Sequence, residues 1–451
     1  WTTTTSRRPI SYSMFRIIRV ANKCIENIGM VQNAKLIDKD DLIGQAHFVR
    51  AFAHFTLCRI FGGMPYIDKA LEADDSWDMT RLSAWETYAR CAEDLDRAYD
   101  YFVAAGKVRR DALPGSEGHL TSSDMAYPNG IAAKALKARC LIYAASELNN
   151  LHGQSDWQDA ADACAEAIRL AQQYGYDLVP FTEWNSNFYG TKYTNEHIWA
   201  WNYGSSKINT TTWSAHFGYP ASNYTNASGD CPTQNFVDRF ETLDGDPLLT
   251  EADRAAAAAA GHYNEQDPYT NRDPRLDKTI LHDGSVVAGC PAGINIHYDP
   301  ATGTYPTSSL NNNARTFGIA WGSNDSKGYS NTGYYVNKLW NGALGTAAAH
   351  QHTDPLIRMA ELYLNYAEAY VEYHGTLAGQ ALQYMNDIRD RVGVPRIDDA
   401  WKGIPGKDYR AIIRQERTIE LMFEGHRYFV ARRWNIAHLT FAEPSKRWNC
   451  F

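Results

Sequence analysis

Three polar, loop-like stretches combine aromatic rings with hydrogen-bonding groups, a combination that suits a sugar ligand. A pyranose needs a flat ring against its C–H face and amides, carboxylates or guanidinium groups for its hydroxyls. In the first stretch, residues 74–78, Trp77 is flanked by three aspartates. Because a tryptophan among so many charges is rarely fully buried, we predict that Trp77 lies at the surface and that Asp75 contacts ligand hydroxyls.

The other two stretches run from Asn209 to Tyr224 and from His297 to Trp321, and both mix rings with amide and hydroxyl groups. The alternative for any single ring is that it pins an irregular segment onto the rest of the fold. These stretches supply the remaining candidates, with stacking rings at Trp213, Tyr219, Tyr224, Tyr305 and Trp321 and hydroxyl-binding groups at Asn223 and Arg315.

Catalysis is the first alternative to binding. Glycoside hydrolysis needs two carboxylates about 5–10 Å apart across the scissile bond. Asp74, Asp75, Glu183 and Asp230 are available, but acidic residues are too abundant for any pairing to be informative. No nucleophile elbow or phosphate loop is present, and the eight cysteines show no metal-binding spacing. The sequence therefore favours a binding protein that is not an enzyme and uses no cofactor or metal.

Length, charge and composition further limit the kind of protein and its partners. The chain has 451 residues, a formal charge of −8 and 44% hydrophobic residues, enough for a substantial core. The acidic balance argues against a nucleic-acid partner. The first residue is Trp1, not methionine, and Cys24 lies in a helical pattern without an apolar leader, so it is a poor lipidation site. We therefore expect the sequence as given to lack its natural start.

Periodicity divides the chain into three regions. Residues 1–175 form an N-terminal helical-repeat part, residues 176–352 a long irregular insertion that binds ligand, and residues 353–451 a C-terminal helical part of the same scaffold. Helix Gln45–Phe61 is apolar nearly all round and ends at Gly62-Gly63-Met64-Pro65. Ser83 and Glu86 have the spacing of a capping box. The short-turn helix pairs predict a mainly α, tetratricopeptide-like fold.

Two further patterns make specific predictions. Residues 198–203 alternate like a strand, which places Trp199, Trp201 and Tyr203 on one face, predicted to pack on the scaffold. In the C-terminal run, Glu416 falls on the apolar face of a helix and needs a charged partner. Gly425 is predicted either to end that helix or to form a tight bend before a second short helix. The nearby candidates for the partner are Arg417, Arg427, Arg432 and Arg433.

The run Arg414–Trp434 resembles the C-terminal signature of the SusD/RagB family. Other fragments resemble the family's sequence in the family's order. They lie at Gly44–Pro65, Arg81–Leu95, Ala133–Ala144, Pro232–Glu241, Arg272–Leu276, Thr332–Lys338 and Ile357–Ala369.

This resemblance implies a surface lipoprotein of Bacteroidota that captures glycans for a SusC-like TonB-dependent transporter in the outer membrane. It also implies an N-terminal lipid anchor, which is not visible in these residues, and a stacking aromatic near the Trp77 loop. Within the family, a peptide-binding RagB-like member and a lid without its own ligand contacts remain alternatives. The many loop tryptophans and tyrosines favour a glycan over a peptide.

Overall fold

The computed structural model describes residues 10–110, 123–189, 192–202, 231–286, 294–295, 315–316, 332–339, 353–397 and 408–442. In this part of the chain most residues are helical, which confirms the expected mainly α, tetratricopeptide-like fold. None of the described helices is both long and apolar enough to cross a membrane.

The N-terminal helices are α1 (Ile10–Asn27), α2 (Leu36–Phe61), α3 (Ala84–Ala104), α4 (Gly130–Ala145) and α5 (Gln154–Gln173), with short 3₁₀ turns η1 (Ile28–Met30) and η3 (Ser123–Ala126). The C-terminal helices are α10 (Met359–His374), α11 (Gly379–Val392), α12 (Tyr409–Glu420), α13 (Arg427–Arg433) and α14 (Ala437–Thr440).

Between these two sets lie short elements. They are η4 (Phe181–Asn187), β1 (His197–Asn202), α7 (Gln234–Val237), α8 (Glu251–Ala259), α9 (Arg275–Thr279), β2 (Ile280–Leu281), β3 (Ile294–Asn295), β4 (Arg315–Thr316), β5 (Tyr335–Val336) and β6 (Thr353–Arg358). The described strands pair two by two, β1 with β6, β2 with β5 and β3 with β4.

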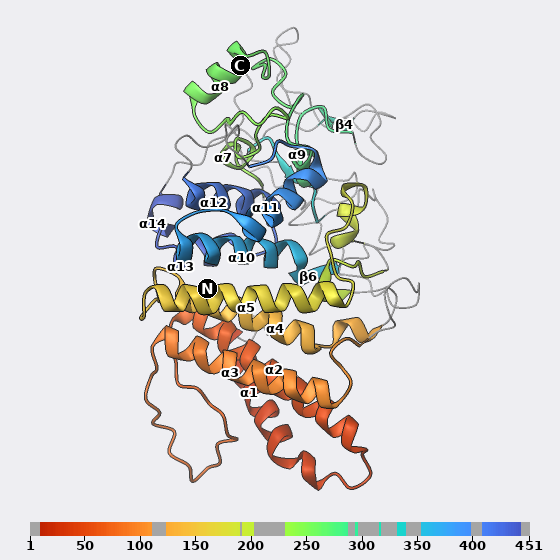
Figure 1. Ribbon diagram of the computed structural model, residues 1–451, viewed down its shortest axis with the longest axis vertical. Coiled ribbons are helices and arrows are strands. Elements are labelled where there is room, and N and C mark those ends of the chain that lie inside the picture. The colour runs from red at the N-terminus through yellow and green to blue at the C-terminus, as the bar shows by residue number, and fades with distance from the viewer. Residues whose placement is uncertain are drawn as a thin grey trace.

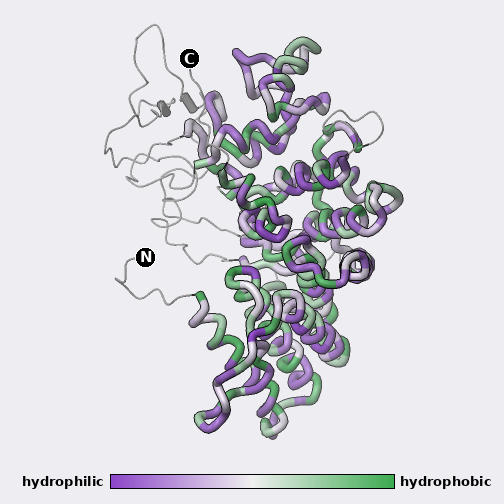
Figure 2. The backbone as a smooth tube through the Cα atoms, turned by 90° about the vertical axis from the view of Figure 1, so that its left-hand side faces the viewer, coloured by the Kyte–Doolittle hydropathy of each residue, from purple (hydrophilic) through white to green (hydrophobic). Residues whose placement is uncertain are grey.

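The helices form a stack in which each packs on its neighbour in sequence, from α1 to α5. The stack then continues from α5 to α10, which also contacts α11 and α12 (Figure 1). One buried core runs through both helical sets, from Phe48 and Leu136 to Leu364 and Ile388. Hydrophobic and hydrophilic residues alternate along the helices (Figure 2), as packing on one or two faces requires.

Helix α4 lies at the centre of the stack, between α3 and α5. Most of its residues are buried, including a series of alanines around its whole circumference. Because alanine has no side chain beyond Cβ, neighbouring helices can approach α4 closely on several sides. Its alanine content therefore explains why the stack is dense here without large apolar residues.

The ends of α2 and α3 form as the sequence predicts. Gly62 has φ 82°, a left-handed conformation that ends α2. At the start of α3, Ser83 Oγ accepts from Glu86 N at 3.1 Å, and Glu86 Oε2 accepts from Ser83 N at 2.7 Å, which confirms the capping box. A long ordered loop joins the two helices, visible in orange at the lower left of Figure 1.

Strand β1 bears out the packing expectation only in part. Trp199 is buried edge-on against Phe48 and Phe52, with ring centroids 4.8 and 5.2 Å apart, and its Nε1 donates to Ala126 O. Trp201 is 51% exposed, so its predicted burial is wrong. The ladder to β6 shifts register on both sides of Trp199, which breaks the simple alternation of faces. Tyr203 lies outside the described residues.

Gly63 provides a test of the α2 exit. A Cβ at this position would lie 2.2 Å from Leu82 O and 2.4 Å from Ser83 C, both backbone atoms at the start of α3. We expect Gly63→Ala to lower the free energy of unfolding by about 1–3 kcal/mol, because the two backbone segments must separate. Gly29→Ala is the control, since a Cβ there meets nothing within 4 Å. Urea unfolding of both variants checks this, and equal midpoints would contradict it.

Candidate functional site

The structure describes the side chains of only two predicted site residues, Trp77 and Asp75. It describes the backbone of Arg315, which begins β4. The other candidates, Trp213, Tyr219, Asn223, Tyr224, Tyr305 and Trp321, lie outside the described residues. The described part of the candidate site consists of the Trp77 loop and the contacts that hold the insertion.

The Trp77 ring is presented to solvent by a tight turn. Its side chain is 64% exposed, and its Nε1 donates to Glu72 O at 3.2 Å. Asp75 shapes this turn because its carboxylate accepts from Glu72 N at 2.8 Å and from Lys69 Nζ at 2.7 Å. These same bonds lower the pKa of Asp75. Asp75 thus positions the ring of Trp77.

Helix α1 holds the loop through bonds to its backbone. Asn22 Nδ2 donates to Ile67 O at 3.1 Å and to Lys69 O at 2.8 Å, and Glu26 Oε1 accepts from Ala70 N at 2.7 Å. Glu72 is paired with Lys23 on the same helix. The loop is therefore attached along its length, from residue 67 to residue 72.

A buried polar cluster lies beneath these contacts. Arg50 binds Asp94 through two bonds, of 2.7 and 2.6 Å, and donates to Asn22 Oδ1 at 2.7 Å and to Asp68 O at 2.9 Å. Tyr66 donates to Asp94 at 2.6 Å. Burial alone would raise the pKa of Asp94, but these partners and His47 hold it well below its usual range. The cluster links α1, α2 and α3 to the loop that carries Trp77.

His54 completes this support. Its Nδ1 lies 2.9 Å from Arg50 O, its Nε2 accepts from Ile67 N at 3.0 Å, and its ring stacks on Tyr66 at 4.0 Å. This arrangement requires a neutral ring that donates at Nδ1, and burial lowers the pKa of His54 to about 4. A proton on Nε2 would remove the bond to Ile67.

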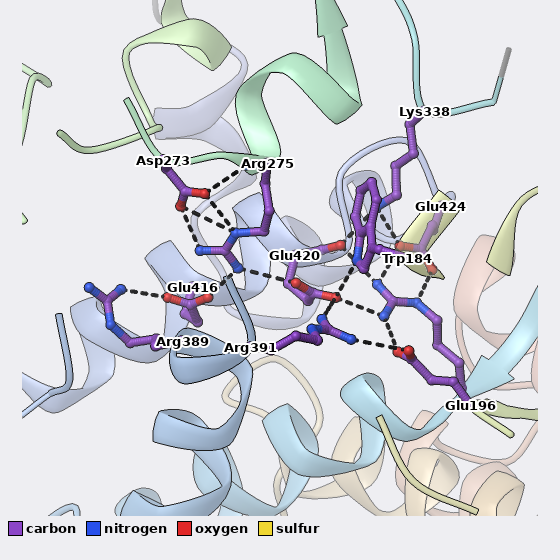
Figure 3. A network of polar contacts seen from close by, with 11 residues as sticks. Trp184, Glu196, Asp273, Arg275, Lys338, Arg389, Arg391, Glu416, Glu420 and Glu424 are labelled. Carbon is purple, nitrogen blue, oxygen red and sulfur yellow. Dashed lines mark hydrogen bonds and ion pairs between the residues drawn. The ribbon is translucent and has the colours of Figure 1, made fainter. Parts of the chain in front are cut away.

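A second set of contacts, the buried charge network shown in Figure 3, fastens the insertion to the C-terminal helices. Glu416 is buried, as predicted, but the expected partners are wrong. It binds Arg275 of α9 and Arg389 of α11, the latter at 2.8 Å. Gly425 has φ 76° and lies just before α13, whereas α12 already ends at Glu420. The expected tight bend before a second short helix is therefore confirmed, and the alternative that Gly425 ends α12 is wrong.

Glu420 lies at the centre of this network (Figure 3). It accepts from Arg391 at 2.6 Å, from Arg358 at 2.8 Å and from Arg275 at 3.1 Å. Trp184 of η4 donates to it at 3.4 Å. Lys338, next to β5, donates to Glu420 O at 2.8 Å. Segments around residues 184 and 275 thus meet the Glu420 carboxylate at the end of α12, and the segment around residue 338 meets the backbone oxygen of the same residue.

The network extends to two more carboxylates. Glu424 accepts from Lys338 at 2.7 Å and from Arg358 at 2.7 Å, and Glu196 accepts from Arg358 at 2.6 Å. Arg275 and Lys338 stand in the sequence fragments Arg272–Leu276 and Thr332–Lys338, which resembled the family. The charged residues of those two fragments were therefore the only sequence feature that pointed to the contact between the insertion and α12.

Among the described residues, no group of histidine, cysteine, aspartate and glutamate side chains is arranged to hold a metal ion. The arrangement that remains is an exposed ring on a firmly attached loop, and an insertion tied down by buried charges.

The His54 contact predicts a pH effect. The unfolded chain takes up a proton on His54 near pH 6.5, whereas the folded protein does so only near pH 4. Stability contributed by neutral His54 is therefore lost as the pH falls from 6.5 to 4. We expect the urea midpoint of unfolding to decrease less between pH 6.5 and pH 4 in His54→Gln than in the unsubstituted protein. His438→Gln, at an exposed position, is the control, and equal slopes in both variants would contradict the prediction.

The Glu420 contact predicts a large loss of stability. Glu420→Gln leaves the guanidinium groups of Arg358, Arg391 and Arg275 buried with less compensating charge, so we expect a loss of about 3–5 kcal/mol in the free energy of unfolding. Glu93→Gln is the control, because its pair with Arg90 is exposed and should change stability by less than about 1 kcal/mol. Chemical unfolding of both proteins measures the difference, and similar losses would refute the central role of Glu420.

Comparisons with known proteins agree with this architecture. Residues 195–451, more than half of the chain, match the family model described as "SusD family", and residues 2–105 match one described as "Starch-binding associating with outer membrane". SusD-like protein P25 of Formosa agariphila is 23% identical over 434 residues, which cover 94% of this chain and 69% of that protein.

Solved structures show the same fold. A SusD-like protein of Bacteroides fragilis superposes with a TM-score of 0.70 at 26% identity, over 95% of this chain and 75% of that chain. A SusD-like carbohydrate binding protein of the same species superposes with a TM-score of 0.69 at 21% identity, over 95% and 73%. From the family match and the shared fold, we conclude that this chain belongs to the SusD family.

Proposed function

We propose that this protein captures a glycan at the cell surface without cleaving it and passes it to a TonB-dependent transporter in the outer membrane. Family membership and the outer-membrane description of the N-terminal match support this proposal. So does the carbohydrate-binding designation of one structural relative. A lipid anchor that precedes the present sequence belongs to the same proposal.

The exposed ring of Trp77 is the observation that carries the binding role. A ring that is 64% exposed on an otherwise solvated loop leaves apolar surface in water, and a sugar face can cover it. Asp74 and Asp78 flank the ring, and neither carboxylate has a hydrogen-bond partner among the described residues. Both can accept from sugar hydroxyls, and Asp75, which holds the turn through one bond on each oxygen, keeps further acceptor capacity for the same role.

The attached loop also suits capture. The bonds from α1, Arg50 and His54 fix the backbone before ligand arrives, so binding costs less conformational entropy than ordering a free loop would. We further propose that rings from the insertion (Trp213, Tyr219, Tyr224, Tyr305 and Trp321), together with Asn223 and Arg315, extend the ligand surface, and that residues 176–352 act as one ligand-binding insertion. The charge network would then hold that insertion in place.

The test combines binding and hydrolysis in one experiment. The purified protein is run through native gels, each of which contains one polysaccharide. The protein is also incubated with each polysaccharide in solution, and the solution is assayed for newly released reducing ends. Retardation by a glycan with no release supports capture. Release of reducing ends would refute the non-catalytic role, and no retardation by any glycan would refute glycan capture and favour a peptide ligand.

Substitution of Trp77 locates the site. We expect Trp77→Ala to weaken binding of the retained glycan about tenfold or more, equivalent to about 1.4 kcal/mol, because the stacking surface is lost. Trp77→Phe should keep part of the affinity. Phe441→Ala, which removes an exposed ring directly after α14, is the matched control and should bind normally. Unchanged affinity of Trp77→Ala, measured by titration calorimetry, would exclude this loop as the site.

A further inference from the structure

A polar groove lies on the helical scaffold, where the α4–α5 turn, the end of α10 and the start of α12 meet. Its volume is ≈ 450 Å³, within the range of about 300–1,000 Å³ that is typical of small-molecule sites. We call it the scaffold groove, and its principal lining residues are Glu147, Gln154, Trp157, Arg410, Arg414 and Trp434.

A guanidinium group without an anionic partner lies in this groove. Arg414 stacks over the ring of Trp434, with its Cζ 4.7 Å from the ring centroid. Trp434 is itself buried and fixed by a bond from its Nε1 to Glu368 at 2.6 Å. Among the described residues no carboxylate lies within ion-pair distance of Arg414, and its Nε is buried without a hydrogen-bond partner. Burial lowers the pKa of Arg414, so an acceptor from a ligand would be favourable here.

The other charges in the groove nearly cancel. Arg410 binds Glu372 through two hydrogen bonds of 2.5 Å, so the positive charge of Arg410 and the negative charge of Glu372 cancel. Glu147 then offsets the charge of Arg414. The groove is therefore close to neutral overall, although it holds strong hydrogen-bonding groups.

Several of these groups are free to meet a ligand. Within the described part of the chain, the carboxylate of Glu147, the amide of Gln154 and the indole N–H of Trp157 have no hydrogen-bond partner. The half-buried ring of Trp157 packs on the core and contributes an aromatic surface to the groove. An aromatic surface beside one carboxylate, one amide and one guanidinium group matches the requirements of a sugar ring with several hydroxyls.

We propose that the scaffold groove is a second saccharide-binding site, selective for neutral sugars and separate from the Trp77 loop. A uronate or sulfated sugar would gain from Arg414 but would be repelled by Glu147, which is unpaired among the described residues, on a protein of net charge −8. Neutral hydroxyls can instead accept from Arg414 and Gln154 and donate to Glu147. Two separate sites on one protein would hold a long polysaccharide more tightly than either site alone.

Hydrogen–deuterium exchange mass spectrometry tests this on the full chain. The probes are maltohexaose, cellohexaose and mannohexaose, with hexagalacturonate as the anionic comparison. We expect at least one neutral hexaose to slow amide exchange in residues 146–157 and 409–414. The same protection should persist in Trp77→Ala, which separates this proposal from the role of the Trp77 loop.

Two exposed substitutions give the sharper result. Glu147→Ala and Gln154→Ala should each raise the ligand concentration for half-protection about three- to tenfold, because each removes one hydroxyl contact without disturbing the core. Glu93→Ala on α3 is the control and should leave protection unchanged. Protection by hexagalacturonate alone would overturn the preference for neutral sugars. Absence of protection with all four probes, or protection that both groove substitutions leave unchanged, would overturn the site.

Discussion

Glu420 is the group on which the arrangement of the insertion depends. Its carboxylate is fully buried, and burial alone would raise its pKa, but Arg391, Arg358 and Arg275 hold that pKa well below its usual range. A buried carboxylate is stable only when several donors surround it at once. The donors come from η4, α9, β6 and α11, so those elements can take only one position relative to α12. Apolar helix packing stabilises the scaffold, and this charge network holds the insertion (residues 176–352) against it.

The sequence predicts the scaffold well because its signals are local. Helix ends follow from glycines and caps, such as Gly62 and the pair Ser83–Glu86, whose partners lie within four residues. The partners of Glu416 could not be predicted in the same way. Arg417 is adjacent on the helix and points about 100° away from Glu416. The actual partners, Arg275 and Arg389, are 141 and 27 residues away. Burial of a charge is visible from periodicity, whereas its partner is a property of the tertiary fold.

The candidate site shows the same division. The surface position of Trp77 follows from the aspartates around it, and the structure places the ring there. The ligand contact of Asp75 stays a prediction, and its carboxylate also accepts from Lys69 and from the backbone of the turn, a role that the sequence did not signal. The supporting residues Arg50 and His54 lie in a helix that was recognised by its apolar residues, so their polar role gave no separate signal. Trp201 is exposed instead of buried because the pairing of β1 with β6 shifts register, and the alternation of residue types along the strand does not reveal such a shift.

The way the Trp77 loop is attached has a consequence for how this protein can evolve. Asn22, Glu26, Arg50 and His54 all bind main-chain atoms of residues 67–70, namely the oxygens of Ile67, Asp68 and Lys69 and the amides of Ile67 and Ala70. Main-chain atoms are the same for almost every amino acid. Mutations along this segment can therefore change the side chains while the path of the loop is preserved. Under the proposed function, ligand preference can therefore diverge through the exposed side chains of this loop, while the helices beneath it keep the path of residues 67–70.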